Sequence, residues 1–237
     1  METRRTFFKT ASRGLALLGL IPGIGATMIS RAWGAAKRRV LPKGTPRQSL
    51  VTENPASLDT TNLEITPLQN FGTMGLSDHK VDLETWRLTV EGEVETPLSL
   101  SYHQILDLPS IEKNVLLICP GVFANNGAWK GVSIKELLKK AGAHREVSHV
   151  VIRGPKNQYA KVNSFPIGDI LSDKVFLAYQ VNGSRLPEKH GFPLRVVAQD
   201  YYGYDWVKYV GELKVEKVRQ ESRLEGDVGG SSCSGDR

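Results

Sequence analysis

The sequence predicts a mixed α+β domain that is rich in β-strands and carries short, interspersed helices. Stretches that alternate between apolar and polar residues, such as 86–92, recur along the chain, and this period is typical of strands. Helical patterns are short and lie between the strand-like stretches. The chain has neither a Gly-x-Gly-x-x-Gly sequence nor a Walker loop after a strand-like stretch, so a dinucleotide or P-loop fold is not indicated.

Local signals define the elements expected within this domain. Ser133 and Glu136 have the spacing of a capping box at a helix start, and Gly142 provides the stop. Asn182 followed by Gly183, between two β-prone runs, predicts a hairpin. In chain order we expect a strand at 86–92, a short helix at 99–108, a buried strand at 114–118, a helix at 133–142, paired strands at 148–154 and 159–163, a helical turn at 165–171, a hairpin at 176–187, and strands at 193–199 and 206–215.

Residues 1–36 have the layout of a twin-arginine signal peptide. Arg4 and Arg5 precede a Phe-Phe-Lys sequence, an uncharged and mildly apolar stretch covers 14–30, and small residues at 34–36 offer a cleavage site. We therefore expect export to the periplasm, with a leader that is cleaved or stays as an anchor. Composition divides the rest of the chain into an extended linker at 37–66, a folded domain at 67–218 and a disordered polar tail at 219–237.

The formal net charge of +6 arises in the leader. The first 39 residues hold eight basic residues and one acidic residue, which leaves 23 basic and 24 acidic residues in the remainder. A basic binding face is therefore not expected, and nucleic acid is not an expected partner.

Cys119 and Cys233 are the two cysteines of the chain. Cys233 lies in the Gly/Ser-rich tail, so a disulfide between them is not favoured even in an oxidising compartment. Cys119 ends an apolar run and precedes Pro120 and Gly121, which places its thiol at a sheet edge beside a polar loop expected at 125–127. A thiol there could be a soft-metal ligand, a nucleophile or a small core residue. No histidine spacing selects a base or a zinc site, so these alternatives stay open on the residues alone.

A second group of candidates lies between His190 and Val210. Arg195 and Lys208 facing one crevice would suit an anion, because Arg supplies a fork of donors and Lys a point charge. The alternative is solvated loop charge with ordinary strand packing. Five aromatic residues fit either a wall for a flat ligand or ordinary strand packing, namely Tyr201, Tyr202, Tyr204, Trp206 and Tyr209.

Taken together, these segments resemble the molybdopterin-binding domain of the sulfite oxidase family, over about residues 66–215. The resemblance rests on residues 85–106, on Cys119 followed by Trp129 and Gly131, and on the stretches LPEKHGFPLRVV and YGYDWVKYVGELKV. Within the family, the layout is closest to exported bacterial members, such as the periplasmic molybdenum-dependent methionine sulfoxide reductase subunit.

The resemblance implies that domain 67–218 binds molybdenum-molybdopterin, with one cofactor per chain. Cys119 would coordinate the molybdenum as a thiolate and would be the catalytic residue. The residues that would hold the pterin and its phosphate are Asn70, Thr73, His190, Arg195, Trp206, Val207 and Lys208.

The chain departs from the family pattern at positions that bear on the substrate. Sulfite oxidases carry arginines after the cysteine and in the upstream segment, whereas 120–127 and 70–75 contain none. His190 matches the sulfite oxidase branch, where the reductase type has Asn, and Gly154 stands where the reductase type has a Thr. We expect an exported oxidoreductase that transfers an oxygen atom to or from a small substrate such as an S-oxide. The alternatives are a sulfite dehydrogenase and a non-catalytic periplasmic binding or scaffold module.

No Cys-x-x-Cys-His haem motif is present in the sequence. The expected enzyme therefore exchanges electrons with a redox partner protein. By family analogy this partner would be a membrane haem or quinone-linked subunit.

Overall fold

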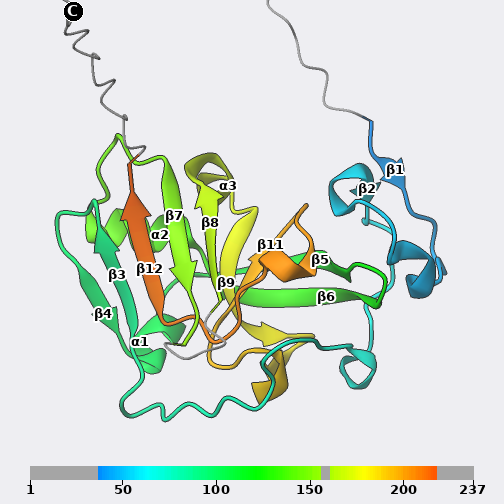
Figure 1. Ribbon diagram of the computed structural model, residues 1–237, viewed down its shortest axis with the longest axis horizontal. Coiled ribbons are helices and arrows are strands. Elements are labelled where there is room, and N and C mark those ends of the chain that lie inside the picture. Colours follow the sequence, from blue (N-terminus) through cyan, green and yellow to red (C-terminus); the bar gives the residue numbers. More distant parts are fainter. Residues whose placement is uncertain (1–36, 156–160, 218–237) are drawn as a thin grey trace, which may run out of the picture. The chain divides into compact units, whose positions relative to one another are not determined.

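Two five-stranded sheets form most of the protein (Figure 1). The computed structural model describes residues 37–155 and 161–217, so the expected signal peptide and polar tail lie outside the described residues. Strands dominate and the α-helices are short, which confirms the predicted β-rich α+β class. Among the described residues, no helix has both the length and the apolar character needed to cross a bilayer.

The first sheet has the order β4-β3-β12-β7-β8. Its centre is β12, which pairs in parallel with β3 and antiparallel with β7. This arrangement brings the C-terminal strand of the domain between two strands that come much earlier in the chain. The strands are β3 (Leu88–Gly92), β4 (Leu98–Leu100), β7 (His149–Arg153), β8 (Val162–Pro166) and β12 (Glu212–Glu216).

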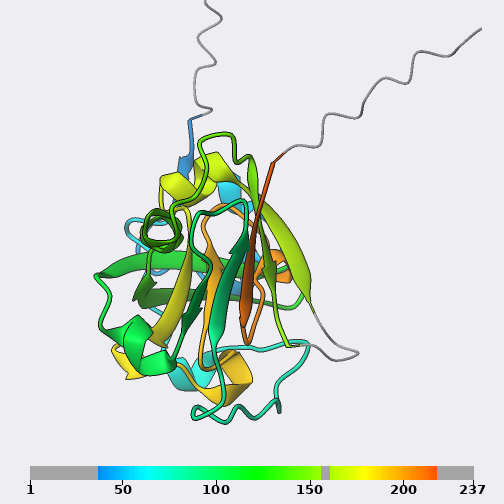
Figure 2. The ribbon, with the colours of Figure 1, turned by 90° about the vertical axis from the view of Figure 1, so that its left-hand side faces the viewer.

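The second sheet has the order β10-β9-β6-β5, and β11 also pairs with β9. Its two long strands, β5 and β6, run across the strands of the first sheet in both ribbon views (Figures 1 and 2). Apolar side chains from both sheets form one core with the helix α2 (Ile134–Ala141). The strands are β5 (Ser110–Cys119), β6 (Phe123–Val132), β9 (Val175–Val181), β10 (Ser184–Arg185) and β11 (Arg195–Ala198).

Several predicted elements are present where the sequence indicated them. The hairpin at Asn182 and Gly183 joins β9 to β10, with Val181 opposite Ser184. Gly142 ends α2 in a left-handed conformation, at φ 66°, which only glycine adopts without strain. Helix α3 (Ile167–Leu171) forms the expected helical turn.

Other predictions were wrong, and competition for hydrogen bonds explains one of them. The hydroxyl of Ser133 does not cap α2, because it donates to the carboxylate of Asp173 instead. The capping box forms at Ser101 and Gln104, at the start of α1 (Tyr102–Leu106). The helix expected at 99–108 therefore begins later, and its first residues belong to β4.

Pairing in the sheets overturned two further expectations. The polar loop expected at 125–127 is part of β6, where Asn125 and Asn126 are buried. The turn after Cys119 is correspondingly tight and spans only 120–122. The strand expected at 206–215 begins only at Glu212, since Tyr209 has a φ of 55° that no regular strand accommodates.

Residues 37–66 are a packed part of the domain, which corrects the expected extended linker. Their buried leucines contact Leu116 and Ile118 of β5 and Ala124 of β6. The Asn126 amide donates to the carbonyl of Leu63, at 2.8 Å, and holds the segment against β6. The elements are β1 (Arg39–Val40), β2 (Leu58–Asp59) and 3-10 turns at Arg47–Leu50 and Pro55–Ser57; the buried apolar residues are Leu41, Leu50, Val51, Leu58 and Leu63.

This packing predicts a specific loss of stability. Leu41 is fully buried, whereas its neighbour Val40 is 55% exposed. Leu41→Ala should lower the free energy of unfolding by about 2–4 kcal/mol, because it leaves a cavity under β5 and β6. Val40→Ala, the matched control, should change it by less than about 0.5 kcal/mol. Urea denaturation of the protein measures both, and equal effects of the two variants would show that the segment is a linker after all.

Candidate functional site

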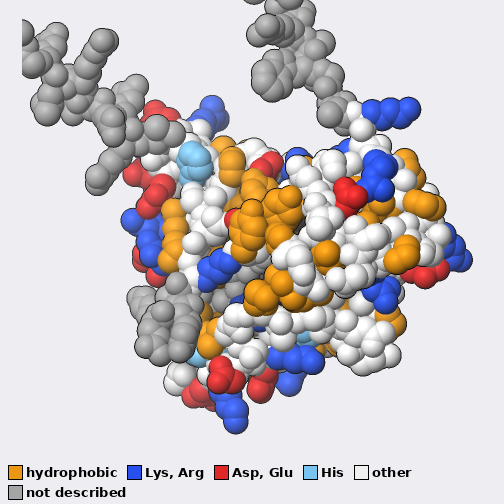
Figure 3. All heavy atoms as spheres, turned by 45° about the vertical axis from the view of Figure 1, so that its right-hand side comes forward, with side chains coloured by type: hydrophobic (Ala, Val, Ile, Leu, Met, Phe, Trp, Pro, Cys, Tyr) orange, Lys and Arg blue, Asp and Glu red, His pale blue; other side chains and the backbone are white. Residues whose placement is uncertain are grey.

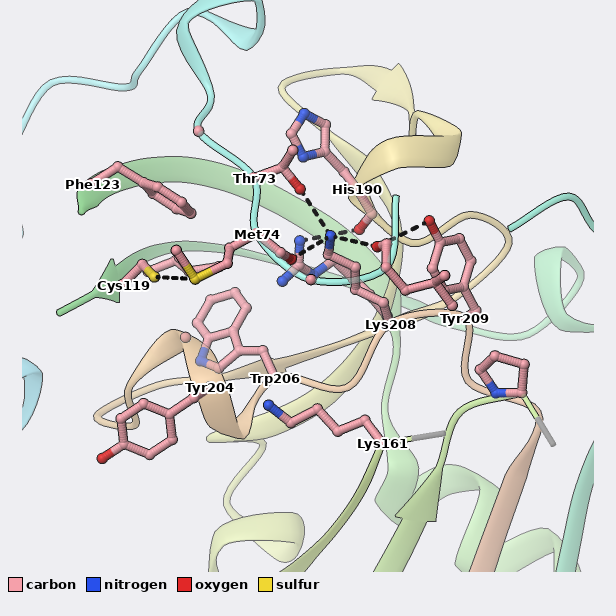
Figure 4. A pocket seen from close by; sticks show the side chains of 17 residues that line it. Thr73, Met74, Cys119, Phe123, Lys161, His190, Tyr204, Trp206, Lys208 and Tyr209 are labelled. Carbon is pink, nitrogen blue, oxygen red and sulfur yellow. Dashed lines mark hydrogen bonds between the residues drawn. The ribbon is translucent and has the colours of Figure 1, made fainter. Parts of the chain in front are cut away.

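A cavity of about 330 Å³ lies at the end of β5. It is formed by segments that are far apart in the chain: 72–76, the β5–β6 turn, Lys161 before β8, 190–195 and 203–209 (Figure 4). Its walls include Thr73, Met74, Leu117, Cys119, Phe123, Lys161, His190, Arg195, Tyr204, Trp206, Lys208 and Tyr209.

Cys119 is the last residue of β5 and is partly buried at the cavity wall. The strand ends here because Pro120 and Gly121, at φ 73°, turn the chain into β6. The thiol lies 3.7 Å from the Sδ atom of Met74. Burial raises the pKa of the Cys119 thiol, and the nearby charge of Lys161 acts in the opposite direction. A partly buried thiol at a strand end, open to a cavity, can serve as a ligand to a soft metal.

Arg195 is the most deeply buried charged group of the site, at 4% exposure. Its guanidinium lies over the rings of Trp129 and Trp206, 5.0 and 5.3 Å from their centroids. It donates to the carbonyl of His190 at 3.1 Å. Burial lowers the pKa of Arg195 to about 9, so the cation is retained at neutral pH only at a cost in desolvation.

The Trp129 and Gly131 motif has a structural role beneath this arginine. Trp129 is fully buried in β6 and anchors its indole nitrogen on the carbonyl of Val115, at 3.0 Å. Gly131 sits at a β-bulge where β6 pairs with β9. A Cβ atom there would collide with the backbone of Leu177. Only glycine therefore lets the two strands approach closely enough to place Trp129 below Arg195.

His190 is 1% exposed and ends a 3-10 turn. Burial, together with the charges of Arg195, Lys189 and Lys208, lowers the pKa of His190 to about 4. The imidazole is therefore neutral at physiological pH. Its Nε2 atom is buried and has no hydrogen-bond partner within 37–155 and 161–217. Such an orphaned polar atom at a cavity wall is costly unless a ligand satisfies it.

Gly191 closes the turn that carries His190. Its φ of 106° favours glycine, and a Cβ atom would press on Lys208 and Arg195 at 3.0 and 3.2 Å. The glycine thus allows His190, Arg195 and Lys208 to crowd into one wall of the cavity. An isolated β-bridge between Arg195 and Lys208 fixes the two cations side by side.

The ammonium of Lys208 is hydrogen-bonded to protein oxygens and does not point freely into the cavity. Its ammonium donates to the Thr73 hydroxyl at 2.8 Å and to the carbonyls of Met74, Leu76 and Lys189 at 3.0 Å each (Figure 4). Burial and the charges of Arg195 and Lys161 lower the pKa of Lys208 to about 8. Four acceptors exceed the three N–H groups of an ammonium. Lys208 therefore clamps the 73–76 segment over the cavity while adding positive charge to it.

The structure brings six of the eight sequence-predicted site residues to the cavity wall. Two do not line it: Asn70 is exposed at the end of a 3-10 turn, and Val207 is buried in the apolar core. Residues 206–208 do not form a regular strand, so the alternation of side chains along a strand does not predict which of them face the cavity. The six that line the cavity are Thr73, Cys119, His190, Arg195, Trp206 and Lys208.

Sequence reasoning missed Lys161, Met74 and Phe123 as wall residues. Lys161 stands alone before β8, and no motif around it distinguishes it from a surface lysine. Met74 and Phe123 reach the site only because 72–76 crosses the β5–β6 turn, where Gly72 packs on the Phe123 ring. The proximity of Met74 to Thr73 in the sequence was the one available signal.

Comparison with known proteins identifies the family. A family model described as the oxidoreductase molybdopterin binding domain matches residues 75–224. The chain belongs to this family. It is accordingly an oxidoreductase whose cofactor is molybdenum-molybdopterin, and the resemblance to the sulfite oxidase type is confirmed.

Individual relatives within the family differ in how much of their length the chain covers. It is 30% identical to the uncharacterized oxidoreductase YuiH of Bacillus subtilis, over 57% of this chain and 68% of that one. It is 26% identical to the protein-methionine-sulfoxide reductase catalytic subunit MsrP of Xanthomonas axonopodis, over 91% and 73%. It is 31% identical to the mitochondrial sulfite oxidase of Macaca fascicularis, over 69% of this chain but only 35% of that protein.

A solved structure shares the fold of this molybdopterin-binding domain. The sulfane dehydrogenase SoxCD of Paracoccus pantotrophus aligns with a TM-score of 0.56 and 27% identity. The match covers 61% of this chain and 41% of that one. The chain therefore corresponds to one part of several larger enzymes.

The residues present fit the cofactor. Molybdopterin carries an anionic phosphate, and the cavity offers the Arg195 cation, for which no carboxylate partner exists within the described ranges. The buried Nε2 atom of His190 is available for a further hydrogen bond. Cys119 supplies a soft sulfur ligand to the same cavity.

The neutral state of His190 predicts an acid-sensitive stability. The folded protein holds this imidazole neutral down to pH about 4, whereas the unfolded chain takes up a proton near pH 6.5. Below pH 6.5 the unfolded chain therefore binds a proton that the folded protein does not, so the free energy of unfolding falls as the pH drops from about 6.5 toward 4. Between pH 7 and pH 5 the fall amounts to about 2 kcal/mol of unfolding free energy. Urea denaturation at both pH values should show this difference in the wild type and a smaller one in His190→Gln. The same change in unfolding free energy between pH 7 and pH 5 in both proteins would refute the neutral state of His190.

Proposed function

We propose that the chain is an exported molybdenum-molybdopterin enzyme that transfers an oxygen atom to or from a small substrate, with Cys119 as the protein ligand of the metal. The observation that carries the proposal is that the Cys119 thiol lies in the same cavity as the buried guanidinium of Arg195, which has no carboxylate partner among the described residues. The first group suits a soft metal and the second an anionic pterin.

Each wall residue has a role in this proposal. Cys119 binds the metal as a thiolate and tunes its electronics. Arg195 and the Nε2 atom of His190 hold the cofactor phosphate. Lys208 does not bind the phosphate, because its ammonium is occupied by four protein oxygens. Three of these contacts hold the 73–76 segment at the cavity wall. Apolar side chains such as Trp206 limit the access of water.

When bound, the molybdenum centre supplies two-electron redox chemistry coupled to oxygen transfer. For an S-oxide substrate, the overall reaction consumes two electrons and two protons and yields the thioether and water. The electrons come from a redox partner, for which we propose a separate protein such as a membrane haem or quinone-linked subunit. The Xanthomonas relative is the catalytic subunit of its methionine-sulfoxide reductase, which supports a separate protein as the electron donor.

Sulfite oxidation is a weaker candidate for the same site. Arg195 is the one arginine at the cavity wall among the described residues, and it lies against Trp129 and Trp206. A small oxyanion with several charged oxygens would need more free donors than the wall provides. A non-catalytic scaffold is disfavoured because the family is one of oxidoreductases.

The metal assignment can be tested by elemental analysis. Wild-type protein from a host that makes molybdopterin should contain about one molybdenum per chain and should reduce S-oxides with an artificial electron donor. Cys119→Ala should lose the metal and the activity, because the thiolate ligand is removed. Cys233→Ala, which alters the other cysteine of the chain, is the matched control and should retain both. Metal-free wild type from such a host would exclude the proposal.

Export can be tested separately through the leader. Replacing Arg4 and Arg5 together by lysine should abolish the periplasmic fraction in a host with twin-arginine transport, since that route reads the arginine pair. Arg13→Lys changes a third arginine of the leader and should leave export intact. Immunoblots of periplasmic and spheroplast fractions measure the outcome. Equal export of the double variant and the wild type would contradict the route.

A further inference from the structure

We propose that Lys161 is a specificity-determining residue that binds an anionic group on an otherwise apolar substrate. This inference rests on the proposed oxygen-transfer function and names the substrate class of that site. The substrate would be an organic S-oxide or related oxide that carries one carboxylate or sulfonate. Three cations line the cavity, namely Lys161, Arg195 and Lys208.

Two of these cations are already engaged. Arg195 is covered by Trp129 and Trp206 and donates to backbone carbonyls, and the proposed function assigns its remaining donors to the cofactor phosphate. Lys208 has each of its N–H groups directed to protein oxygens. By contrast, the ammonium of Lys161 has neither a hydrogen-bond acceptor nor an ion-pair partner within residues 37–155 and 161–217.

The surroundings of Lys161 favour a ligand over bulk solvent. Its side chain extends along Trp206 and Tyr204 into the cavity (Figure 4). Burial lowers the pKa of Lys161, while the charge of Asp205 favours the protonated form. Lys161 and Cys119 line the same cavity, so an anion bound by the ammonium would lie in the cavity that also holds the thiol. A partly desolvated ammonium without a counter-ion is stabilised by any anion that enters.

The rest of this wall is apolar and so limits the kind of anion. Leu117, Phe123 and Tyr204 line the same cavity as Cys119, and Met74 lies against the Cys119 sulfur. Met74 and Tyr204 are also well exposed, and apolar side chains gather on one face of the molecule (Figure 3). One free charge in an apolar wall matches a ligand with an apolar body and one anionic group. A compact, strongly hydrated oxyanion would lose more hydration than one ammonium restores.

A different role for Lys161 would be to hold the cofactor itself. The two roles differ in what a variant loses. A cofactor ligand affects molybdenum and pterin content, whereas a substrate ligand affects binding of anionic compounds only. The test therefore uses two aryl methyl sulfoxides that differ in one group, 4-(methylsulfinyl)benzoate and methyl p-tolyl sulfoxide.

The measurements are dissociation constants by calorimetry, turnover with a reduced viologen, and molybdenum content, all on the metal-loaded full chain. Lys161→Met should weaken binding of the benzoate about 10- to 100-fold, the range of a charge-assisted contact. It should change binding of the neutral sulfoxide less than about twofold and should leave the molybdenum content unaltered. Lys161→Arg should restore most of the benzoate affinity. Lys139→Met, on the exposed face of α2, is the matched control and should behave as wild type.

Each outcome decides one of the two proposals. Equal weakening of both sulfoxides, loss of molybdenum, or no effect of Lys161→Met would overturn the role of Lys161. Wild type that shows no preference for the benzoate would also overturn it, while turnover of the neutral sulfoxide would leave the proposed function standing. Lysine-dependent binding of the benzoate without turnover of either compound would remove oxygen transfer from S-oxides and keep the anion site.

Discussion

The guanidinium of Arg195 is buried without a carboxylate partner in the described ranges, and much of the structure is arranged around it. Taking such a cation out of water costs several kcal/mol unless other groups compensate. Trp129 from β6, Trp206 from the segment before β12 and the carbonyl of His190 supply that compensation. These groups come from different elements, so Arg195 is held in place only when those elements pack together. The same packing thereby positions a cation for the anionic cofactor.

Positive charge at the cavity is divided between three tasks. Arg195 is held inside the wall, Lys208 fastens the 73–76 segment, and Lys161 faces open space. Burial, together with the charges of Arg195 and Lys208, lowers the pKa of His190 and keeps the imidazole neutral, so its Nε2 atom is a donor or an acceptor according to tautomer. If Lys161 has the role proposed above, a site with few free donors and mostly apolar walls would distinguish substrates by a single charge rather than by a ring of arginines.

Part of this arrangement was predictable because it depends on local chemistry. A cysteine before Pro-Gly at the end of an apolar run predicts a thiol at a strand end, and Asn182-Gly183 predicts a hairpin. The packing of 37–66 was not predictable, since its apolar residues follow neither a helical nor a strand period and find their partners on β5 and β6. Ser133 failed as a cap because Asp173, distant in sequence, offers a charged acceptor.

By itself, the sequence determined the β-rich class, the family resemblance and six of the residues that line the cavity, because strand period, turn chemistry and motif spacing can be read along the chain. Only the tertiary structure decided what those residues do. It showed that Lys208 is a clamp, that Val207 belongs to the core and that Lys161 faces the cavity. Burial and hydrogen-bond occupancy separate a structural cation from one that can bind a ligand, and both depend on contacts between segments that the chain order does not reveal.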